Sequence, residues 1–148
     1  MNLPAIQTPA KPIKLYRFSL SGHSHRVELF LSLLGLPVEL INVDLAAGAQ
    51  KTPEFLEMNP FGQVPVIQDG EVTLADANAI LVYLAGRYDD GRWLPRDPLQ
   101  AAEVQRWLSV AAGLLAFGPA AARFNKLFKA MFNAEEVTGR TQRLLEVM

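Results

Sequence analysis

The sequence predicts an α/β domain with a mixed four-stranded sheet, followed by an all-helical domain. Over residues 13–43, two segments that alternate apolar and polar residues flank a segment of helical period. Asp69-Gly70 then stands between two β-type runs, which is a strong hairpin signal. Residues 91–98 carry two prolines and break every period, and the chain after them is helical in pattern. We therefore expect domains at residues 13–90 and 99–148.

The first half of the α/β domain predicts a strand, a helix and a second strand. Residues 13–18 alternate like a half-buried strand, and residues 38–43 form the second β-type run. Between them, apolar residues recur at helical spacing until Gly35 and Pro37 end the run: Val27, Phe30, Leu31 and Leu34. Because a helix connects the two strands, they should lie parallel with a right-handed crossover.

The second half predicts a short helix, a hairpin and a longer helix. Thr52 followed by Pro53 is typical of a helix start. Residues 64–68 and 71–74 flank Asp69-Gly70 and should pair antiparallel. Asp76 should cap the last helix, one face of which carries Ile80, Tyr83, Leu84 and Arg87. This β-α-β-α-β-β-α order, with helices on both faces of the sheet, is the thioredoxin-like arrangement.

The region after Pro98 predicts three helices. Residues 99–117 should form one long helix that ends at Gly118-Pro119, and a third helix should start near Ala134. The second helical segment, 120–133, presents Phe124, Leu127, Phe128, Met131 and Phe132. Such wide apolar faces need more cover than three helices can give one another.

Composition narrows the classes of partner. The 148 residues carry a formal charge of −1 and are 50% hydrophobic, with scattered Lys and Arg, so we expect neither nucleic-acid nor membrane-surface binding. No cysteine is present, which excludes disulfides and thiolate metal ligands. No apolar run approaches the ~20 residues of a membrane span. The opening residues 1–12 lack the order of a signal peptide, so we expect a loose extension on a cytoplasmic protein.

Residues 59–67 set Pro65 directly against the start of an apolar β-type run. A proline cannot donate to a sheet ladder, so it should lie at the first residue of a strand or on an edge. The backbone of Val64 would then be free to pair with a short extended peptide. An ordinary turn proline is the alternative.

Ser21 lies at the predicted start of the first helix, where unpaired N–H groups and the helix dipole favour an anion. A hydroxyl at this point could donate to a thiolate, or it could simply cap the helix. His23 and His25 are spaced by two residues and should point in different directions. We assign neither histidine a chemical role and expect no metal site.

Residues 21–27 and 59–67 together resemble the glutathione S-transferase family, in particular its serine-type zeta, phi and theta-like classes. The resemblance implies a thioredoxin-like glutathione-binding domain with a cis-proline at Pro65. It places the catalytic serine at Ser21, with Ser19 and Ser24 as alternatives. Glutathione would be the co-substrate, and no metal would be involved.

The resemblance also implies which residues hold the tripeptide. Lys51 matches a family lysine that reaches the glycine carboxylate, whereas Gln50 replaces a histidine and Ala77 replaces a serine. Loss of that serine hydroxyl should cost about 1 kcal/mol in binding. The implied contacts run from the glycine end through the middle to the γ-glutamyl end: Gln50, Lys51, Gln63, Val64, Pro65, Asp76 and Ala77.

The resemblance covers residues 14–88 well and fades beyond Pro98, where roughly half of the family's usual helical domain is missing. It implies a detoxifying transferase in which the glutathione thiolate attacks a small apolar electrophile. It also implies a homodimer, with Phe61 either an interface anchor or locally packed. The alternatives are a glutathione-dependent disulfide reductase and a non-catalytic binding or interaction module on the same fold.

Overall fold

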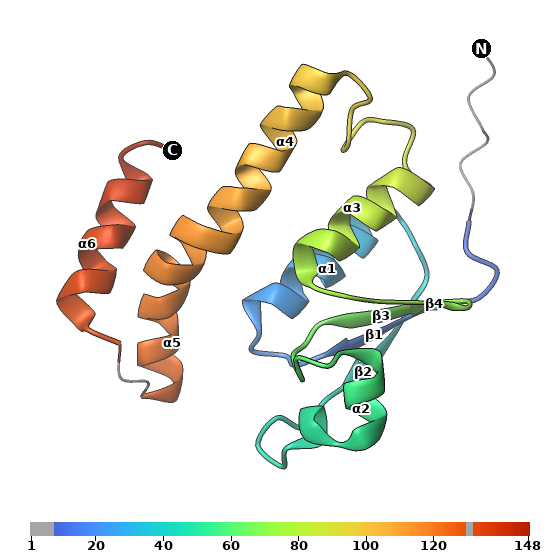
Figure 1. The fold of residues 1–148 in the computed structure, drawn as a ribbon, viewed down its shortest axis with the longest axis horizontal. Coiled ribbons are helices and arrows are strands. Elements are labelled where there is room, and N and C mark those ends of the chain that lie inside the picture. The colour runs from blue at the N-terminus through green and yellow to red at the C-terminus, as the bar shows by residue number, and fades with distance from the viewer. Residues whose placement is uncertain (1–7, 130–131) are drawn as a thin grey trace. The chain divides into compact units, whose positions relative to one another are not determined.

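The computed structural model describes residues 8–129 and 132–148. The chain divides into two compact units, one up to Pro95 and one from Arg96 onward, and each is described by itself (Figure 1). The first unit is α/β and the second is helical. Met131, one of the apolar residues expected in the second unit, and the first seven residues of the N-terminal extension lie outside the described residues.

A mixed four-stranded sheet forms the centre of the first unit, which confirms the predicted fold class. Its strands are β1 (Ile13–Arg17), β2 (Val38–Asn42), β3 (Val66–Asp69) and β4 (Val72–Ala75), in the order β2-β1-β3-β4. β1 pairs parallel with β2 and antiparallel with β3, and β3 pairs antiparallel with β4. The helix-linked pair is therefore parallel and the hairpin pair antiparallel, as the periodicities predict.

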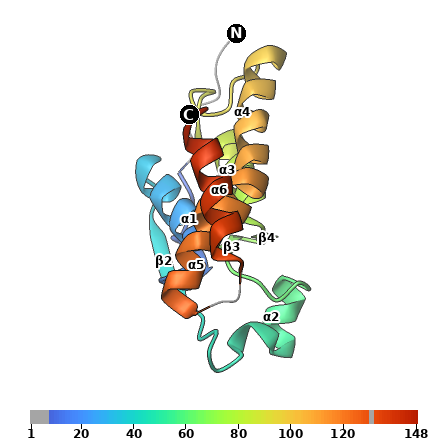
Figure 2. The same ribbon diagram turned by 90° about the vertical axis from the view of Figure 1, so that its left-hand side faces the viewer.

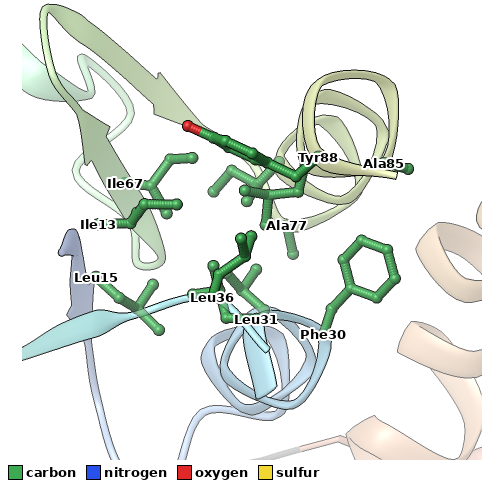
Figure 3. Close-up of a cluster of buried hydrophobic side chains, with 12 residues drawn as sticks. Ile13, Leu15, Phe30, Leu31, Leu36, Ile67, Ala77, Ala85 and Tyr88 are labelled. Carbon is green, nitrogen blue, oxygen red and sulfur yellow. The ribbon is translucent and has the colours of Figure 1, made fainter. Parts of the chain in front are cut away.

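Helices cover both faces of this sheet. α1 (Gly22–Leu33) and α3 (Ala77–Tyr88) pack on one face, where Ile13, Leu15 and Ile67 meet the helices in a fully buried cluster (Figure 3). η1 (Ala49–Lys51) and α2 (Pro53–Met58) belong to the other face, where a second core cluster contains Val43, Phe55 and Val66. Neighbouring Val66 and Ile67 thus point to opposite faces, as the period of a strand requires.

The predicted helix caps form as expected, whereas the hairpin turn lies one residue later than predicted. Thr52 Oγ1 accepts from the Phe55 N–H at 3.4 Å, and Asp76 Oδ1 accepts from the Ala79 N–H at 2.9 Å. At the hairpin, however, Asp69 pairs with Val72 inside the ladder. The turn therefore lies one residue later than Asp69-Gly70, because the Asp69 carboxylate is buried against α3 and keeps this residue in the strand.

The second unit begins with α4 (Pro98–Val110), which continues through the π-helical stretch η2 (Ala111–Ala120) into α5 (Ala121–Phe128). The prediction that Gly118-Pro119 ends the helix is wrong. Proline removes an N–H and crowds the preceding turn, and the wider π-helical turns accommodate it. α6 (Ala134–Leu145) runs beside this long helix (Figure 2). Gly118 marks a close approach between them, since a Cβ there would lie 3.4 Å from the backbone of Arg140.

The continuous helix over residues 98–128 is long and apolar enough to cross a membrane, by length and composition only. Only 11% of its most apolar stretch is buried. A single helix of this length and composition is weak evidence for a membrane span. The expectation that the chain does not cross a bilayer stays a prediction.

Candidate functional site

Ser21 occupies the N-cap of α1, directly after the loop that follows β1. Its Oγ accepts a hydrogen bond from the Ser24 N–H at 3.2 Å, and the side chain is half-buried. A hydroxyl has two lone pairs and one proton, so accepting from an amide leaves the proton available to donate. The two roles considered for Ser21, helix cap and donor to an anion, are therefore compatible.

Ser24 is 1% exposed, and its Oγ accepts from the Phe18 N–H at 3.3 Å. This bond ties the start of α1 to the end of the β1 segment. Ser24 is thus placed to support the loop and not to meet a ligand, whereas Ser19 is exposed. Of the three serines considered, Ser21 alone combines partial exposure with the helix N-cap.

Asn59 shapes the segment that leads to Pro65. It is 5% exposed, its Nδ2 donates to the Gln63 carbonyl at 2.8 Å, and its Oδ1 accepts from the Phe61 N–H at 3.1 Å. Its own carbonyl accepts from the Gly62 N–H at 2.8 Å. Asn59 was not among the residues predicted for the site, although Asn-Pro is a recognised turn signal that could have indicated it.

The peptide bond between Val64 and Pro65 is cis, as the resemblance implies. Pro65 is buried and immediately precedes β3, whose ladder begins at Val66. The backbone of Val64 therefore lies outside the ladder, and the neighbouring Gln63 side chain is exposed. This is the arrangement that pairing with an extended peptide requires.

Lys51, at the end of η1, reaches the same segment. Its Nζ lies 3.5 Å from the Phe61 carbonyl oxygen, beside Gly62. A Cβ at Gly62 would lie 2.7 Å from the Lys51 Nζ and 2.8 Å from the Gln50 carbonyl oxygen. Gln50 itself has a buried Oε1 without a hydrogen-bond partner among the described residues. The exposed Lys51 ammonium therefore lies at this loop beside the Gln50 side chain, whose amide oxygen accepts no hydrogen bond from the described residues.

Asp76 and Ala77 form the junction between β4 and α3. Asp76 has φ 72° and ψ 124°, a backbone conformation that non-glycine residues rarely adopt. Such a residue persists only where its surroundings over-determine it, at a cost of about 1–3 kcal/mol. Ala77 is the first residue of α3 and is 3% exposed.

A cluster of charged and polar groups connects this junction to α1. Arg26 Nη1 donates to the Asn78 Oδ1, a contact that bridges α1 and α3. Partial burial and the nearby Arg26 guanidinium lower the pKa of the His23 imidazole, and the Asp76 carboxylate opposes them. Within residues 8–129 and 132–148, no group of three or more His, Cys, Asp or Glu side chains could hold a metal ion. Arg26 belongs to the family motif at residues 21–27, but no role was predicted for it.

The family model described as "Glutathione S-transferase, N-terminal domain" matches residues 11–86. The chain belongs to the glutathione S-transferase family. A zeta-class glutathione S-transferase from Euphorbia esula is 44% identical over 96 residues, 64% of this chain and 43% of that protein. Glutathione S-transferase 3 from Zea mays is 42% identical over 100 residues, 67% of this chain and 45% of that protein. The chain thus matches less than half the length of these curated relatives.

Solved structures of this family share the fold. Poplar glutathione transferase F1 superposes with a TM-score of 0.83 at 27% identity, covering 93% of this chain and 68% of that one. A Bombyx mori glutathione transferase gives a TM-score of 0.84 at 27% identity, covering 95% and 66%. A Drosophila mojavensis homologue, solved with bound glutathione, gives 0.81 at 26% identity, covering 92% and 64%.

Proposed function

We propose that this chain binds glutathione and acts as a glutathione transferase, in which the glutathione thiolate attacks a small apolar electrophile. The register of the sheet carries this proposal. Tyr16 pairs with Val66, and Val66 pairs with Ala75. The end of β1, the start of β3 and the end of β4 therefore lie at the same end of the sheet. This end carries the Ser21 loop, Pro65 and Asp76.

At the sulfur end, Ser21 is the proposed donor to the thiolate. Its free hydroxyl proton and the positive end of α1 both favour the ionised form, which should lower the pKa of the bound thiol. The protein forms no covalent bond with the ligand in this scheme. It increases the rate by providing the thiolate and by orienting the electrophile.

In the middle of the ligand, the backbone of Val64 pairs with glutathione in the manner of an added strand. Pro65 has no N–H and ends the protein's own ladder at this point. Gln63 and Gln50 line this part of the site, and the Lys51 ammonium meets the glycine carboxylate. Gly62 supports this geometry, because its missing side chain leaves room for Lys51.

At the γ-glutamyl end, the Ala77 N–H at the start of α3 binds the ligand's α-carboxylate. The Asp76 carboxylate faces the α-ammonium group while still capping α3. An alanine at position 77 leaves this end with one hydroxyl donor fewer than the family's usual serine.

The wider proposal is a cytoplasmic detoxifying homodimer with domains at residues 13–90 and 99–148. Phe61 supports the dimer, since it is 81% exposed and its N–H is held by the Asn59 side chain. An exposed aromatic ring on a hydrogen-bonded turn is a suitable interface anchor.

Calorimetric titration with glutathione, followed by turnover assays with an aryl halide and with a mixed disulfide, tests the proposal. We expect glutathione binding and turnover of the aryl halide. Turnover of the mixed disulfide alone would favour the reductase, and binding without turnover of either substrate would favour a non-catalytic module. A chain that does not bind glutathione at millimolar concentration contradicts the proposed site.

A further inference from the structure

We propose that Arg26 and Asn78 are a positioning pair that holds the start of α3 against α1, and that this pair sets the affinity of the site for the γ-glutamyl end of glutathione. The inference rests on the proposed function. It assigns a role to a side-chain contact between two residues that lie 52 positions apart in the sequence.

The position of Asn78 makes the contact relevant to binding. Asn78 is the second residue of α3, directly after Asp76 and Ala77, which form the proposed γ-glutamyl subsite. Its side-chain oxygen accepts from the guanidinium of Arg26, which lies within α1. Holding Asn78 therefore restrains the peptide groups immediately before it.

The apolar core cannot supply this restraint by itself. Val27 of α1 and Ile80 and Leu84 of α3 are fully buried in one cluster, but apolar contacts have no preferred direction. A hydrogen bond from a charged guanidinium has a defined length and angle and is stronger than a neutral one. Arg26 is also partly shielded from water, which strengthens the bond.

The electrostatics agree with this geometry. Burial lowers the pKa of Arg26, and the Asp76 carboxylate opposes that effect, so this carboxylate lies within electrostatic reach of the guanidinium. Asp76 keeps a rare backbone conformation at φ 72°. The Arg26 charge and the Asn78 bond both favour the arrangement in which Asp76 stays there.

The pair should act on one end of the ligand only. Ser21 is held by its own bond from the Ser24 N–H, so loss of the Arg26–Asn78 contact leaves the sulfur end in place. We therefore expect the glutathione Kd and KM to rise about tenfold, which corresponds to ~1.4 kcal/mol. The kcat at saturating glutathione and the pKa of the bound thiol should stay unchanged.

The test compares two ligands in four variants. Arg26→Met, Asn78→Ala, the double variant and Arg26→Lys are titrated with glutathione and with cysteinylglycine, which lacks the γ-glutamyl group. We expect the first three variants to lose affinity for glutathione, with a loss in the double variant that is smaller than the sum of the two single losses, and to keep the wild-type affinity for cysteinylglycine. Arg26→Lys should recover part of the affinity, because an ammonium can donate but lacks the guanidinium geometry. Arg106→Met, which removes an exposed arginine paired with Glu103, is the matched control.

Three outcomes overturn the inference while leaving the proposed function intact. They are unchanged glutathione affinity in the variants, equal losses for both ligands, and additive losses in the double variant. If Arg26→Met does not fold, Asn78→Ala alone decides by the same comparison of ligands. A wild-type protein that does not bind glutathione would instead remove the proposed function, and this inference with it.

Discussion

The buried carboxylate of Asp69, at the end of β3, accepts a hydrogen bond from the Tyr88 hydroxyl of α3 at 2.5 Å. The Tyr83 hydroxyl donates to the same oxygen at 2.7 Å, and the Arg87 Nε lies 3.5 Å from it. Three groups from one helix thus converge on a single carboxylate oxygen. A buried charge is tolerated when it is paired and hydrogen-bonded in this way, so the cluster anchors α3 to the hairpin.

Removing this carboxylate should destabilise the first unit. Asp69→Ala leaves two tyrosine hydroxyls without their acceptor and the Arg87 guanidinium without its ion-pair partner, and we expect a loss of about 3 kcal/mol in the free energy of unfolding. Urea denaturation followed by circular dichroism measures the loss. Asp90→Ala, at an exposed carboxylate, should change stability by no more than ~0.5 kcal/mol. Equal stability of the two variants would show that the cluster does not anchor α3.

The same cluster predicts a stability change at alkaline pH. Burial, together with the bond to Asp69, raises the pKa of Tyr83 to about 12. An unfolded tyrosine ionises near pH ~10, so stability from this group is fully present below that pH and is lost as the pH rises toward the folded pKa. Denaturation curves between about pH 10 and 12 should show this loss in the wild type. Tyr83→Phe should show a smaller decline, and an identical decline would contradict the assignment.

Ser21→Ala should separate catalysis from binding. The bound thiol should have a pKa below the ~8.5 of a free thiol in the wild type, and the variant should lose that shift. Turnover should fall by about 100-fold, as when a donor to a developing anion is removed, while glutathione affinity stays nearly intact. Ultraviolet titration of the bound thiolate and steady-state kinetics measure both effects.

Ser24→Ala is the matched control for that experiment. It should cost about 1 kcal/mol of stability through its lost bond to the Phe18 N–H and leave turnover near the wild-type level. If Ser24→Ala loses more activity than Ser21→Ala, the chemistry has been assigned to the wrong serine.

Gly62→Ala should weaken glutathione binding by displacing Lys51. Gly62 has φ 59°, and an added Cβ would lie 2.8 Å from the Gln50 carbonyl oxygen, where the backbone has to shift. We expect about a tenfold rise in the glutathione Kd with a loss of at least ~1 kcal/mol in stability. Gly86→Ala, in α3 with open space at the Cβ position, should instead be neutral or stabilising by up to ~1 kcal/mol. Unchanged affinity in Gly62→Ala would remove the proposed role of this loop in placing Lys51.

Phe61→Ala should shift the protein toward monomer. Truncating an aromatic anchor typically costs ~2 kcal/mol or more in association, whereas Phe61→Leu keeps apolar bulk and should retain part of the dimer. Sedimentation of wild type and both variants at low micromolar concentration measures the effect. Identical sedimentation of all three would show that Phe61 packs locally.

The sequence by itself determined the elements of the first unit. Each of these elements depends on interactions within a few residues, so it can be predicted from a short segment. Examples are the strand alternation over residues 13–18, the helix start at Thr52-Pro53 and the helix cap at Asp76. The family motifs then indicated Ser21 and Pro65 as the centre of a site. Local signals failed at Gly118-Pro119, because the π-helical turns of η2 accommodate a proline that would usually end a helix.

Only the tertiary structure decided which distant residues meet. The pairing register of three strands brings the Ser21 loop, Pro65 and Asp76 to the same end of the sheet. The Arg26–Asn78 and Asp69–Tyr88 bonds join residues 52 and 19 positions apart. No periodicity or turn signal specifies such pairs, because their geometry depends on how the helices dock on the sheet.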